Sequence, residues 1–164
     1  MSPPDVAFRP ATTHDEPFLR RMLWIAAHWD QPDPAPPDVA LPTELARYTD
    51  GFGRSGDRGY VATREGASVA AAWCRRLTPP DSGYGYVADD VPELSVAVSP
   101  DSRRRGIAAG LIELLLADLE GEAPAVSLSV EPRNPARLLY ERLGFVKVAR
   151  NGEAWTMVRS LTPP

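Results

Sequence analysis

One stretch of the sequence decides the fold, and it reads Val96-Ala97-Val98-Ser99-Pro100-Asp101-Ser102-Arg103-Arg104-Arg105-Gly106-Ile107-Ala108-Ala109-Gly110-Leu111. An apolar run typical of a strand leads through a proline turn into three arginines, and small residues then open a leucine-rich segment. We predict a helix from Arg104 to about Glu120, buried against a sheet by a wide apolar face. Arginines in the first turn of a helix face the positive end of its dipole, at a cost of roughly 0.3–1 kcal/mol each. The pattern therefore predicts a negatively charged ligand.

Small residues at the same place would let such a ligand reach the backbone. Free N–H groups at a helix start bind phosphate, and Gly106, Ala108 and Ala109 carry no bulky side chain that would keep a diphosphate away. Gly110 costs about 1 kcal/mol relative to alanine inside a helix, so we expect its size to serve close packing or ligand approach. The stretch is not a Walker loop, because no Gly-Lys-Ser/Thr follows, and its glycine spacing differs from the dinucleotide fingerprint.

The composition indicates one soluble, globular domain over residues 1–164, with 43% hydrophobic and 24% charged residues. A net charge of −4 argues against a nucleic-acid partner, so the arginines are a local feature. Cys74 is the only cysteine, which excludes an intramolecular disulfide and fits a reducing compartment. The chain shows neither a signal peptide nor an apolar run of the roughly 18 residues that a membrane span needs. We expect a cytoplasmic protein without a membrane partner.

Hydrophobic periodicity and turn residues predict a mixed α/β chain. Either Thr13 or His14 could cap a first helix, Thr43 a short second one, and Asn134 a helix that starts at Pro135. Five prolines within 31–42 predict a loop. This order suits a mixed, mostly antiparallel sheet with helices on both faces. We expect strands at 6–9, 59–63, 68–77, 92–99, 125–130, 145–149 and 154–160, and helices from about 15, at 44–48, at 104–120 and at 135–143.

Two motifs resemble signatures of the GNAT N-acyltransferase superfamily. The arginine stretch is similar to the family's acyl-CoA pyrophosphate loop, Gln/Arg-x-x-Gly-x-Gly/Ala, with Arg103, Gly106 and Ala108 in the three places. A second stretch resembles the family's pattern of an Asn, a small residue, a Leu-Tyr pair and Gly-Phe. It reads Asn134-Pro135-Ala136-Arg137-Leu138-Leu139-Tyr140-Glu141-Arg142-Leu143-Gly144-Phe145. The order of elements is also the family's, so the resemblance covers about residues 6–161 and implies the GNAT fold.

The resemblance also implies where acetyl-CoA would bind. The backbone of Val96 and Val98 would pair with the pantetheine arm as an added strand does. Asn134 would hydrogen-bond the pantetheine or simply cap its helix. The pyrophosphate would be held through N–H groups and charge by Arg103, Arg104, Arg105, Gly106, Ile107, Ala108 and Ala109.

Acetyl transfer to an amine makes three chemical demands: the amine must lose a proton, the oxyanion must be stabilised, and the leaving thiolate must be protonated. Backbone N–H groups around Val96 could stabilise the oxyanion. Tyr140 resembles the family's general acid, whose hydroxyl would also bind the cofactor at its sulfur. The alternative for Tyr140 is a core aromatic residue with a satisfied hydroxyl.

The general base has several candidates. Glu93, at the start of the central strand, stands where family members often carry a catalytic glutamate, and Glu131 ends the next strand. Either carboxylate could instead be a solvated strand end, and a water chain or His28 could replace both. Cys74 could suggest an acyl-cysteine intermediate, but it lies in a core-like strand without a nearby histidine. No cluster has metal-ligand spacing, so no metal is expected.

We therefore predict an acetyl-CoA-dependent N-acetyltransferase that acts on a primary amine by direct attack in a ternary complex. The alternative is a non-catalytic acyl-CoA-binding sensor on the same fold, and a third hypothesis changes the acceptor to a hydroxyl group or a protein N-terminus. Acidic loops could attract a cationic amine, whereas nearby aromatic residues could favour an apolar one. An exposed edge strand near the C-terminus would permit a homodimer. The acidic loop residues are Asp30, Asp33, Asp38, Asp81, Asp89 and Asp90.

Overall fold

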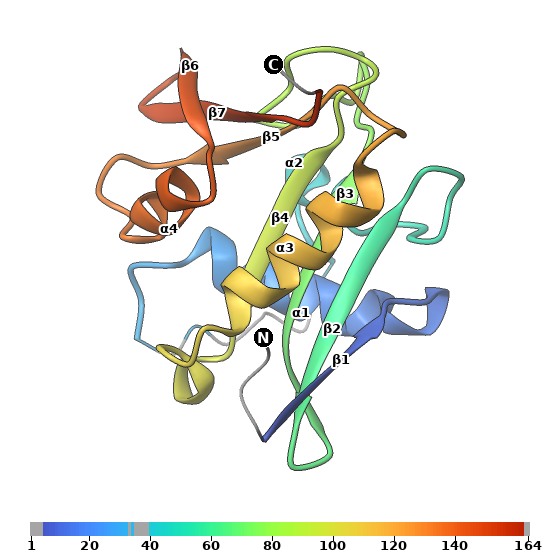
Figure 1. Ribbon diagram of the computed structural model, residues 1–164, viewed down its shortest axis with the longest axis vertical. Helices are drawn as coiled ribbons and strands as arrows, with labels where there is room; N and C mark the ends of the chain where they lie inside the picture. The colour runs from blue at the N-terminus through green and yellow to red at the C-terminus, as the bar shows by residue number, and fades with distance from the viewer. Residues whose placement is uncertain (1–4, 33, 35–39, 163–164) are drawn as a thin grey trace.

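The computed structural model describes residues 5–32, 34 and 40–162, in which seven strands form one sheet in the order β1-β2-β3-β4-β5-β7-β6 (Figure 1). Every neighbouring pair is antiparallel except β4 and β5. This confirms the predicted mixed, mostly antiparallel sheet. The strands are β1 Val6–Pro10, β2 Arg58–Arg64, β3 Ala67–Arg75, β4 Glu93–Val98, β5 Ala125–Val130, β6 Val146–Asn151 and β7 Ala154–Ser160, and the α-helices are α1 Glu16–Ala27, α2 Thr43–Ala46, α3 Ile107–Leu119 and α4 Ala136–Arg142.

Helices cover both faces of the sheet, as Figure 1 shows for α3 in front and α1 behind. The two faces have separate apolar cores, and β3 contributes to both because its side chains alternate. Ala72 and Cys74 belong to the core under α3, whereas Ala71 and Trp73 belong to the core under α1. Burial on both faces explains why the sequence of β3 is a nearly continuous apolar run.

Gly110 lets α3 approach the edge of the sheet closely. A Cβ atom added at Gly110 would lie 2.6 Å from Cε2 of Phe8, a distance that real Cβ contacts do not show. Phe8 itself packs against the core under α3. The expectation that Gly110 serves close packing is therefore confirmed.

Three helix starts differ in detail from the prediction. Thr12, rather than Thr13 or His14, caps the first helical turn, since its extended backbone lets it form a capping box with Asp15. The short helix α2 includes Thr43 as its first residue, with Pro42 at the cap position. Asn134 does cap α4, because its Oδ1 accepts the Ala136 N–H at 3.0 Å, although the helix begins one residue later than predicted.

β6 forms one edge of the sheet and pairs only with β7. All six of its residues are exposed, and Lys147 and Arg150 lie over the Trp155 ring at 4.9 and 4.5 Å from its centroid. A homodimer through this edge remains a prediction.

The proline-rich segment falls largely outside the described residues, as do Asp33 and Asp38 within it. Among the helices of the described residues, none has both the length and the apolar character to cross a membrane.

Candidate active site

The three arginines form a turn ahead of α3 and do not occupy its first turn. After β4 ends at Val98, a 3-10 turn spans Pro100–Ser102, and α3 begins at Ile107. Gly106 precedes the helix with a left-handed φ of +77°. The predicted helix start at Arg104 is therefore wrong, because left-handed residues cannot belong to a right-handed helix.

Left-handed backbone conformations recur in this turn. Arg104 has a φ of +63° and Gly106 one of +77°, whereas Arg105 between them lies outside the left-handed region. Alternation of this kind turns successive N–H groups toward one side and creates an anion-binding nest. A left-handed arginine costs about 1–2 kcal/mol, and such strained residues gather at ligand clamps. Two positive φ values in this turn are compatible with the predicted site for a negatively charged group.

The start of α3 offers further donors. Its first intrahelical bond runs from the Gly110 N–H to the Gly106 carbonyl at 3.2 Å, which leaves the N–H groups of 107–109 without an acceptor in the helix. Within the described residues no side chain caps this end, and the first turn contains no acidic residue. Ala108 and Ala109 add only methyl groups, so a phosphate group can reach these donors.

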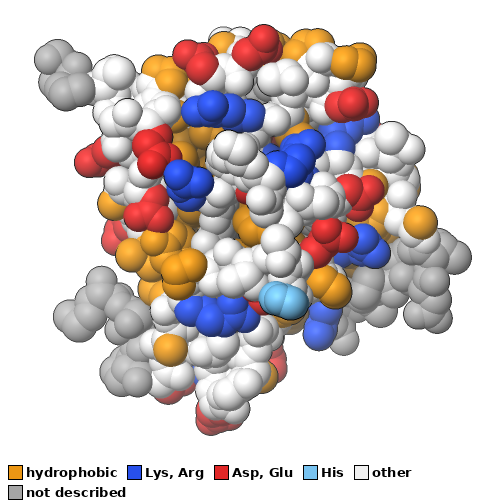
Figure 2. Space-filling view, turned by 90° about the vertical axis from the view of Figure 1, so that its right-hand side faces the viewer, with side chains coloured by type: hydrophobic (Ala, Val, Ile, Leu, Met, Phe, Trp, Pro, Cys, Tyr) orange, Lys and Arg blue, Asp and Glu red, His pale blue; other side chains and the backbone are white. Residues whose placement is uncertain are grey.

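The arginine side chains surround the turn with positive charge, and all three are exposed. Arg103 Nε donates to the Val98 carbonyl at 3.2 Å, and Arg105 lies 3.8 Å from the Asp5 carboxylate. Elsewhere the charges are mixed: on the face drawn in Figure 2, acidic and basic side chains are interspersed. The turn is therefore a local concentration of positive charge on an acidic protein.

β4 and β5 separate beside this turn. The two parallel strands are joined at a single residue pair, Glu93 with Ser127, reinforced by the Ser127 N–H bond to the Pro92 carbonyl at 3.0 Å. β4 continues to pair with β3 as far as Val98, so only its β5 side loses its partner. Figure 1 shows the two strands diverging toward their C-terminal ends.

Val96 and Val98 present their backbone groups to this opening. Backbone groups along a strand alternate between its two neighbours, and the Pro92 carbonyl already points to β5 while the Ser99 N–H points to β3. By the same alternation, the N–H and C=O groups of Val96 and Val98 point toward β5, where no strand meets them, although the Val98 carbonyl accepts from Arg103 Nε. An extended ligand could pair with this free edge as an added strand does.

Glu93 lies at the closed end of the opening and is 4% exposed. Its Oε2 accepts a hydrogen bond from the Tyr48 hydroxyl at 2.6 Å, while Oε1 is buried without a partner among the described residues. Burial raises the pKa of Glu93 to about 7, against the opposing effects of the Tyr48 hydroxyl, the Gly85 N–H and the Arg47 charge. A carboxyl group with a pKa near neutrality can accept and release a proton under working conditions.

Glu131 has different surroundings. It follows β5 four residues after Ser127, so its backbone lies about 13 Å along the strand from the level of Glu93. Its side chain is exposed, and Oε2 accepts a hydrogen bond from the Trp29 indole at 3.3 Å. The structure therefore does not bring the two candidate bases together.

Tyr140 lies on α4 and is buried, with its ring edge-on to Phe145 at a centroid distance of 6.0 Å. Its hydroxyl makes no hydrogen bond within the described part of the chain, and burial raises its pKa above the ordinary value for tyrosine. Tyr140 therefore remains a proton donor at neutral pH. Asn134 uses its oxygen to cap α4, which explains its presence without a ligand.

The remaining candidates have structural surroundings. The His28 ring stacks on Trp24 at 3.9 Å, and its Nδ1 lies 2.9 Å from the Trp24 carbonyl. Cys74 is fully buried, and burial, together with the Glu93 charge, raises the pKa of its thiol. Among the residues that the structure describes, no group of three or more His, Cys, Asp or Glu side chains could hold a metal ion.

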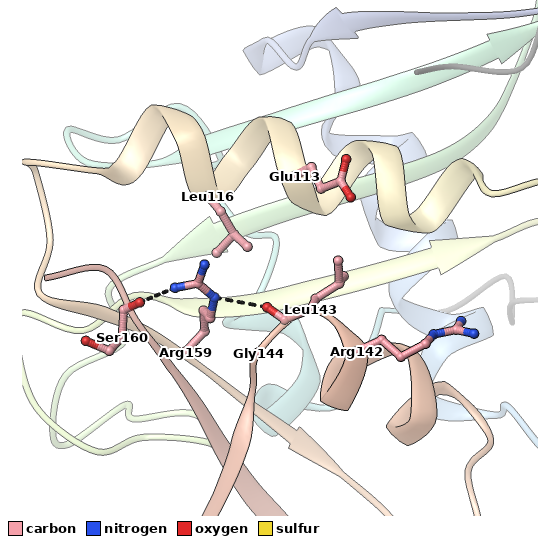
Figure 3. A pocket seen from close by; sticks show the side chains of 7 residues that line it. All are labelled: Glu113, Leu116, Arg142, Leu143, Gly144, Arg159 and Ser160. Carbon is pink, nitrogen blue, oxygen red and sulfur yellow. Dashed lines mark hydrogen bonds between the residues drawn. The ribbon is translucent and has the colours of Figure 1, made fainter. Parts of the chain in front are cut away.

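A cavity of about 510 Å³ is lined by other residues. Figure 3 shows it between α3, the end of α4 and the end of β7, where Arg159 Nε donates to the Leu143 carbonyl at 2.9 Å. None of the predicted site residues lines it, so cavity size does not mark the site. The lining residues are Glu113, Leu116, Arg142, Leu143, Gly144, Arg159 and Ser160.

Sequence reasoning missed two residues that contact Glu93. Tyr48 was assigned only to a short helix, yet its hydroxyl bonds the carboxylate of a residue 45 positions later. Gly83 packs directly on Oε1 of Glu93. The glycines on either side of Tyr84 were the available signal, because Gly in a loop often marks a close backbone approach.

Solved structures share this fold over nearly the whole chain. A putative acetyltransferase from Salmonella typhimurium, with its cofactor acetyl-CoA, has a TM-score of 0.69 at 18% identity and covers 96% of this chain and 95% of its own. The ribosomal-protein-S18-alanine N-acetyltransferase from Escherichia coli scores 0.67 at 21% identity, covering 97% and 96%. A spermidine N-acetyltransferase chimera, derived in part from Vibrio cholerae, scores 0.64 at 17% identity, covering 96% of each chain. Among curated protein sequences none matches.

The fold that contains this splayed parallel pair is thus shared with solved acetyltransferases, one of them with its cofactor acetyl-CoA. The model of the acetyltransferase (GNAT) family matches residues 18–145, which is most of the chain. This protein belongs to the GNAT acetyltransferase family. Its fold is one that binds acetyl-CoA in a solved relative.

Proposed function

We propose that the protein transfers the acetyl group of acetyl-CoA to a primary amine by direct attack in a ternary complex. The observation that carries this proposal is the continuity between the free edge of β4 and the uncapped start of α3. Val96 and Val98 would pair with the pantetheine amides, and the N–H groups of 107–109, together with the arginine turn, would hold the pyrophosphate. The thioester supplied there activates the acetyl group toward attack by the amine.

Glu93 is our assignment for the general base. It is buried, its pKa of about 7 suits proton transfer at neutral pH, and it lies at the closed end of the opening. Glu131 is exposed and accepts a hydrogen bond from Trp29. We place Glu131 and Trp29 at the side of the site where the acceptor amine would bind. Backbone N–H groups near Val96 would stabilise the oxyanion.

Tyr140 is our assignment for the general acid. Its buried hydroxyl has no competing partner within the described residues and keeps its proton, so it can protonate the leaving thiolate. Direct transfer is favoured over an acyl-cysteine route because Cys74 is fully buried with a raised thiol pKa.

Calorimetric titration with acetyl-CoA and CoA, followed by thiol release against a panel of amines, tests the proposal. The related structures suggest two probes, spermidine and a peptide with an N-terminal alanine, and free lysine is added as a simple amine. We expect binding of acetyl-CoA and thiol release that depends on at least one amine. Binding without amine-dependent release would instead support the sensor hypothesis, and absence of binding would contradict the assigned phosphate site.

A further inference from the structure

Glu93 is part of a short buried chain of hydrogen bonds. The Tyr84 N–H donates to the Tyr48 hydroxyl at 2.7 Å, and that hydroxyl donates to Oε2 of Glu93 at 2.6 Å. Tyr48 is 5% exposed, and burial followed by the Glu93 charge raises the pKa of its hydroxyl. The hydroxyl therefore remains a donor throughout the range in which Glu93 titrates. The other groups that act on the Glu93 carboxyl are the Gly85 N–H and the Arg47 charge.

The two oxygens of Glu93 have unequal roles. Oε2 is engaged by Tyr48, whereas Oε1 is buried and has no hydrogen-bond partner among the described residues. Gly83 covers Oε1 so closely that an added Cβ would overlap it, and that Cβ would lie 2.6 Å from the Tyr48 hydroxyl oxygen. Besides Tyr48, the 83–85 loop acts on this carboxyl, because Gly83 covers Oε1 and the Gly85 N–H opposes the rise of the Glu93 pKa.

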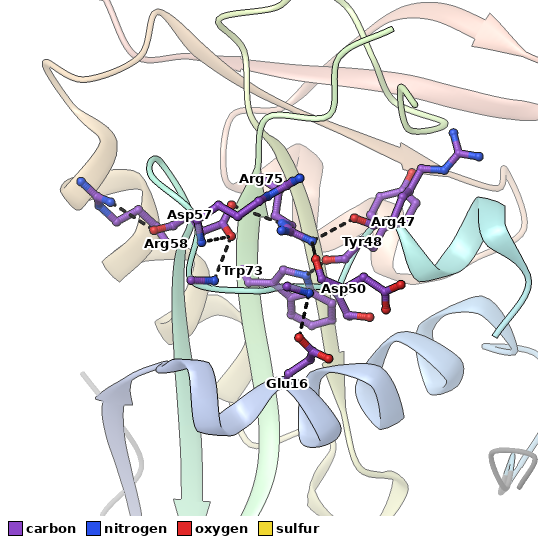
Figure 4. Close-up of polar contacts among 12 residues, drawn as sticks. Glu16, Arg47, Tyr48, Asp50, Asp57, Arg58, Trp73 and Arg75 are labelled. Atoms are coloured by element: carbon purple, nitrogen blue, oxygen red, sulfur yellow. Dashed lines mark hydrogen bonds and ion pairs between the residues drawn. The ribbon is translucent and has the colours of Figure 1, made fainter. Parts of the chain in front are cut away.

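Tyr48 cannot easily leave this position, because the turn that carries it is fastened to β3. Trp73 Nε1 donates to the Tyr48 carbonyl at 2.8 Å. The Arg75 guanidinium donates to the carbonyls of Arg47 and Asp50 at 3.0 and 2.8 Å, and it pairs with Asp57 at 3.2 Å (Figure 4). The side chains of Arg75 and Asp57 are almost completely buried, so this anchor is shielded from water.

We propose that Tyr48 is a positioning residue for the general base: its hydroxyl holds Oε2 of Glu93 and so fixes the carboxyl group that takes up the proton lost by the attacking amine. In that step the amine N–H bond breaks, an O–H bond forms at the Glu93 carboxyl, and the nitrogen lone pair forms the new bond to the acetyl carbon as the thiolate leaves. The inference rests on the proposed function in assigning Glu93 as the base. Its structural part, the control of the Glu93 carboxyl by Tyr48, can be measured without an acceptor.

The first test follows the Glu93 carboxyl itself. Protein labelled with ¹³C at the glutamate Cδ is titrated by NMR, and the Glu93 signal is identified by its loss in Glu93→Gln. We expect an apparent pKa of about 7 in the unaltered protein. Tyr48→Phe should raise this pKa by about one unit, a tenfold weaker acid, because the ionised carboxylate loses a charge-assisted donor. Tyr60→Phe is the matched control, since it removes a hydroxyl that bonds the surface residue Asp118 at 2.5 Å.

A second substitution keeps the hydrogen bond and should shift the Glu93 pKa in the opposite direction. Replacement of Tyr48 by 3-fluorotyrosine makes the hydroxyl a stronger donor and should lower the Glu93 pKa, so the test does not depend on whether Tyr48→Phe folds. An unchanged Glu93 pKa in either variant would overturn the inference.

Kinetics then separate positioning from general stability. With an amine that supports thiol release, the acidic limb of kcat/KM in Tyr48→Phe should move upward in pH with the NMR pKa, and activity should recover at higher pH. A loss of kcat that is equal at every pH would contradict the positioning role. If the NMR shifts occur but no amine supports release, the proposed function fails while the Tyr48–Glu93 coupling stands.

Discussion

Arg75 and Glu93 are direct cross-strand partners on β3 and β4, and both side chains contact the same turn, residues 47–50. Arg75 fastens the 47–50 turn through two carbonyl bonds, and Tyr48 within that turn reaches Glu93. A buried cation thus acts on a buried carboxyl group through the backbone between them. The predictions below follow from this arrangement and from the turn that precedes α3.

Replacement of Glu93 by glutamine should lower kcat by about 100-fold or more, as expected when a general base is removed. Gln preserves size and can still accept from Tyr48, so acetyl-CoA affinity measured by calorimetry should stay within a factor of two or so. Glu131→Gln is the comparison, for which we expect a change in acceptor KM. If kcat stayed at the wild-type value in Glu93→Gln and fell strongly in Glu131→Gln, Glu131 would be the general base and Glu93 would not.

The free energy of unfolding should depend on pH through Glu93. Its pKa is about 7 in the folded protein and 4.5 ordinarily. Between these values the unfolded chain binds fewer protons than the folded one, so this contribution is fully present below pH 4.5 and is lost as pH rises through 7. The full difference amounts to about 3 kcal/mol. Urea unfolding gives the free energy of unfolding of wild type and of Glu93→Gln at each pH, and the difference between them isolates the contribution of Glu93. A difference that stays constant from pH 4.5 to 7 would refute the raised pKa.

Tyr140→Phe should reduce turnover at least tenfold, which corresponds to roughly 1.4 kcal/mol in the barrier. The phenyl ring retains the packing against Phe145, so acetyl-CoA affinity and thermal stability should change little. Tyr60→Phe again provides a control with an equivalent chemical change on the surface. Unchanged turnover in Tyr140→Phe would remove it as the acid.

The double substitution Arg103→Ala and Arg105→Ala should weaken CoA by about tenfold or more but leave pantetheine, which lacks the pyrophosphate, nearly unaffected. Arg20→Ala removes one exposed positive charge from α1 and serves as the control. The effect should shrink at high ionic strength because exposed charges are screened. Equal weakening of CoA and pantetheine would show that the turn does not read phosphate.

Gly110→Ala should destabilise the protein by about 1–3 kcal/mol, because its methyl group would overlap the Phe8 ring. Alanine gains about 1 kcal/mol of helix propensity, which offsets only part of this loss. The additional change Phe8→Leu should recover part of the stability in a double-mutant cycle measured by urea unfolding. A stabilised single variant would show that the ring moves aside without cost.

Local signals predicted most of the fold. The pair Asn151-Gly152 predicts a hairpin between the last two strands; the hairpin forms, but its turn is Gly152-Glu153 because Asn151 still pairs with Ala154. Gly144, with a φ of +92°, ends the helical segment where expected. The start of α3 was predicted three residues too early, at Arg104, although its apolar periodicity begins only at Ile107. Arg104 has a side chain compatible with a helix, and nothing in its type announces a φ of +63°.

The candidate site was predictable only in part. Glu93 and Tyr140 were identified through a family resemblance, which supplies position but not environment. The bond from Tyr48 to Glu93 spans 45 residues and follows from the anchoring of the 47–50 turn by Trp73 and Arg75. Contacts of that separation leave no periodic trace in a single sequence, because they depend on how β3 and β4 pair in the folded chain.

The single residue pair between β4 and β5 divides the sheet into two antiparallel halves, β1 to β4 and β5 with β7 and β6. Backbone pairing is continuous within each half but nearly absent between them, so cooperativity across the seam depends on helix packing. A molecule seated between Val96 and the β5 side would complete the missing ladder. Binding of that molecule would then also join the two halves of the sheet, and amide hydrogen exchange should slow in both halves at once.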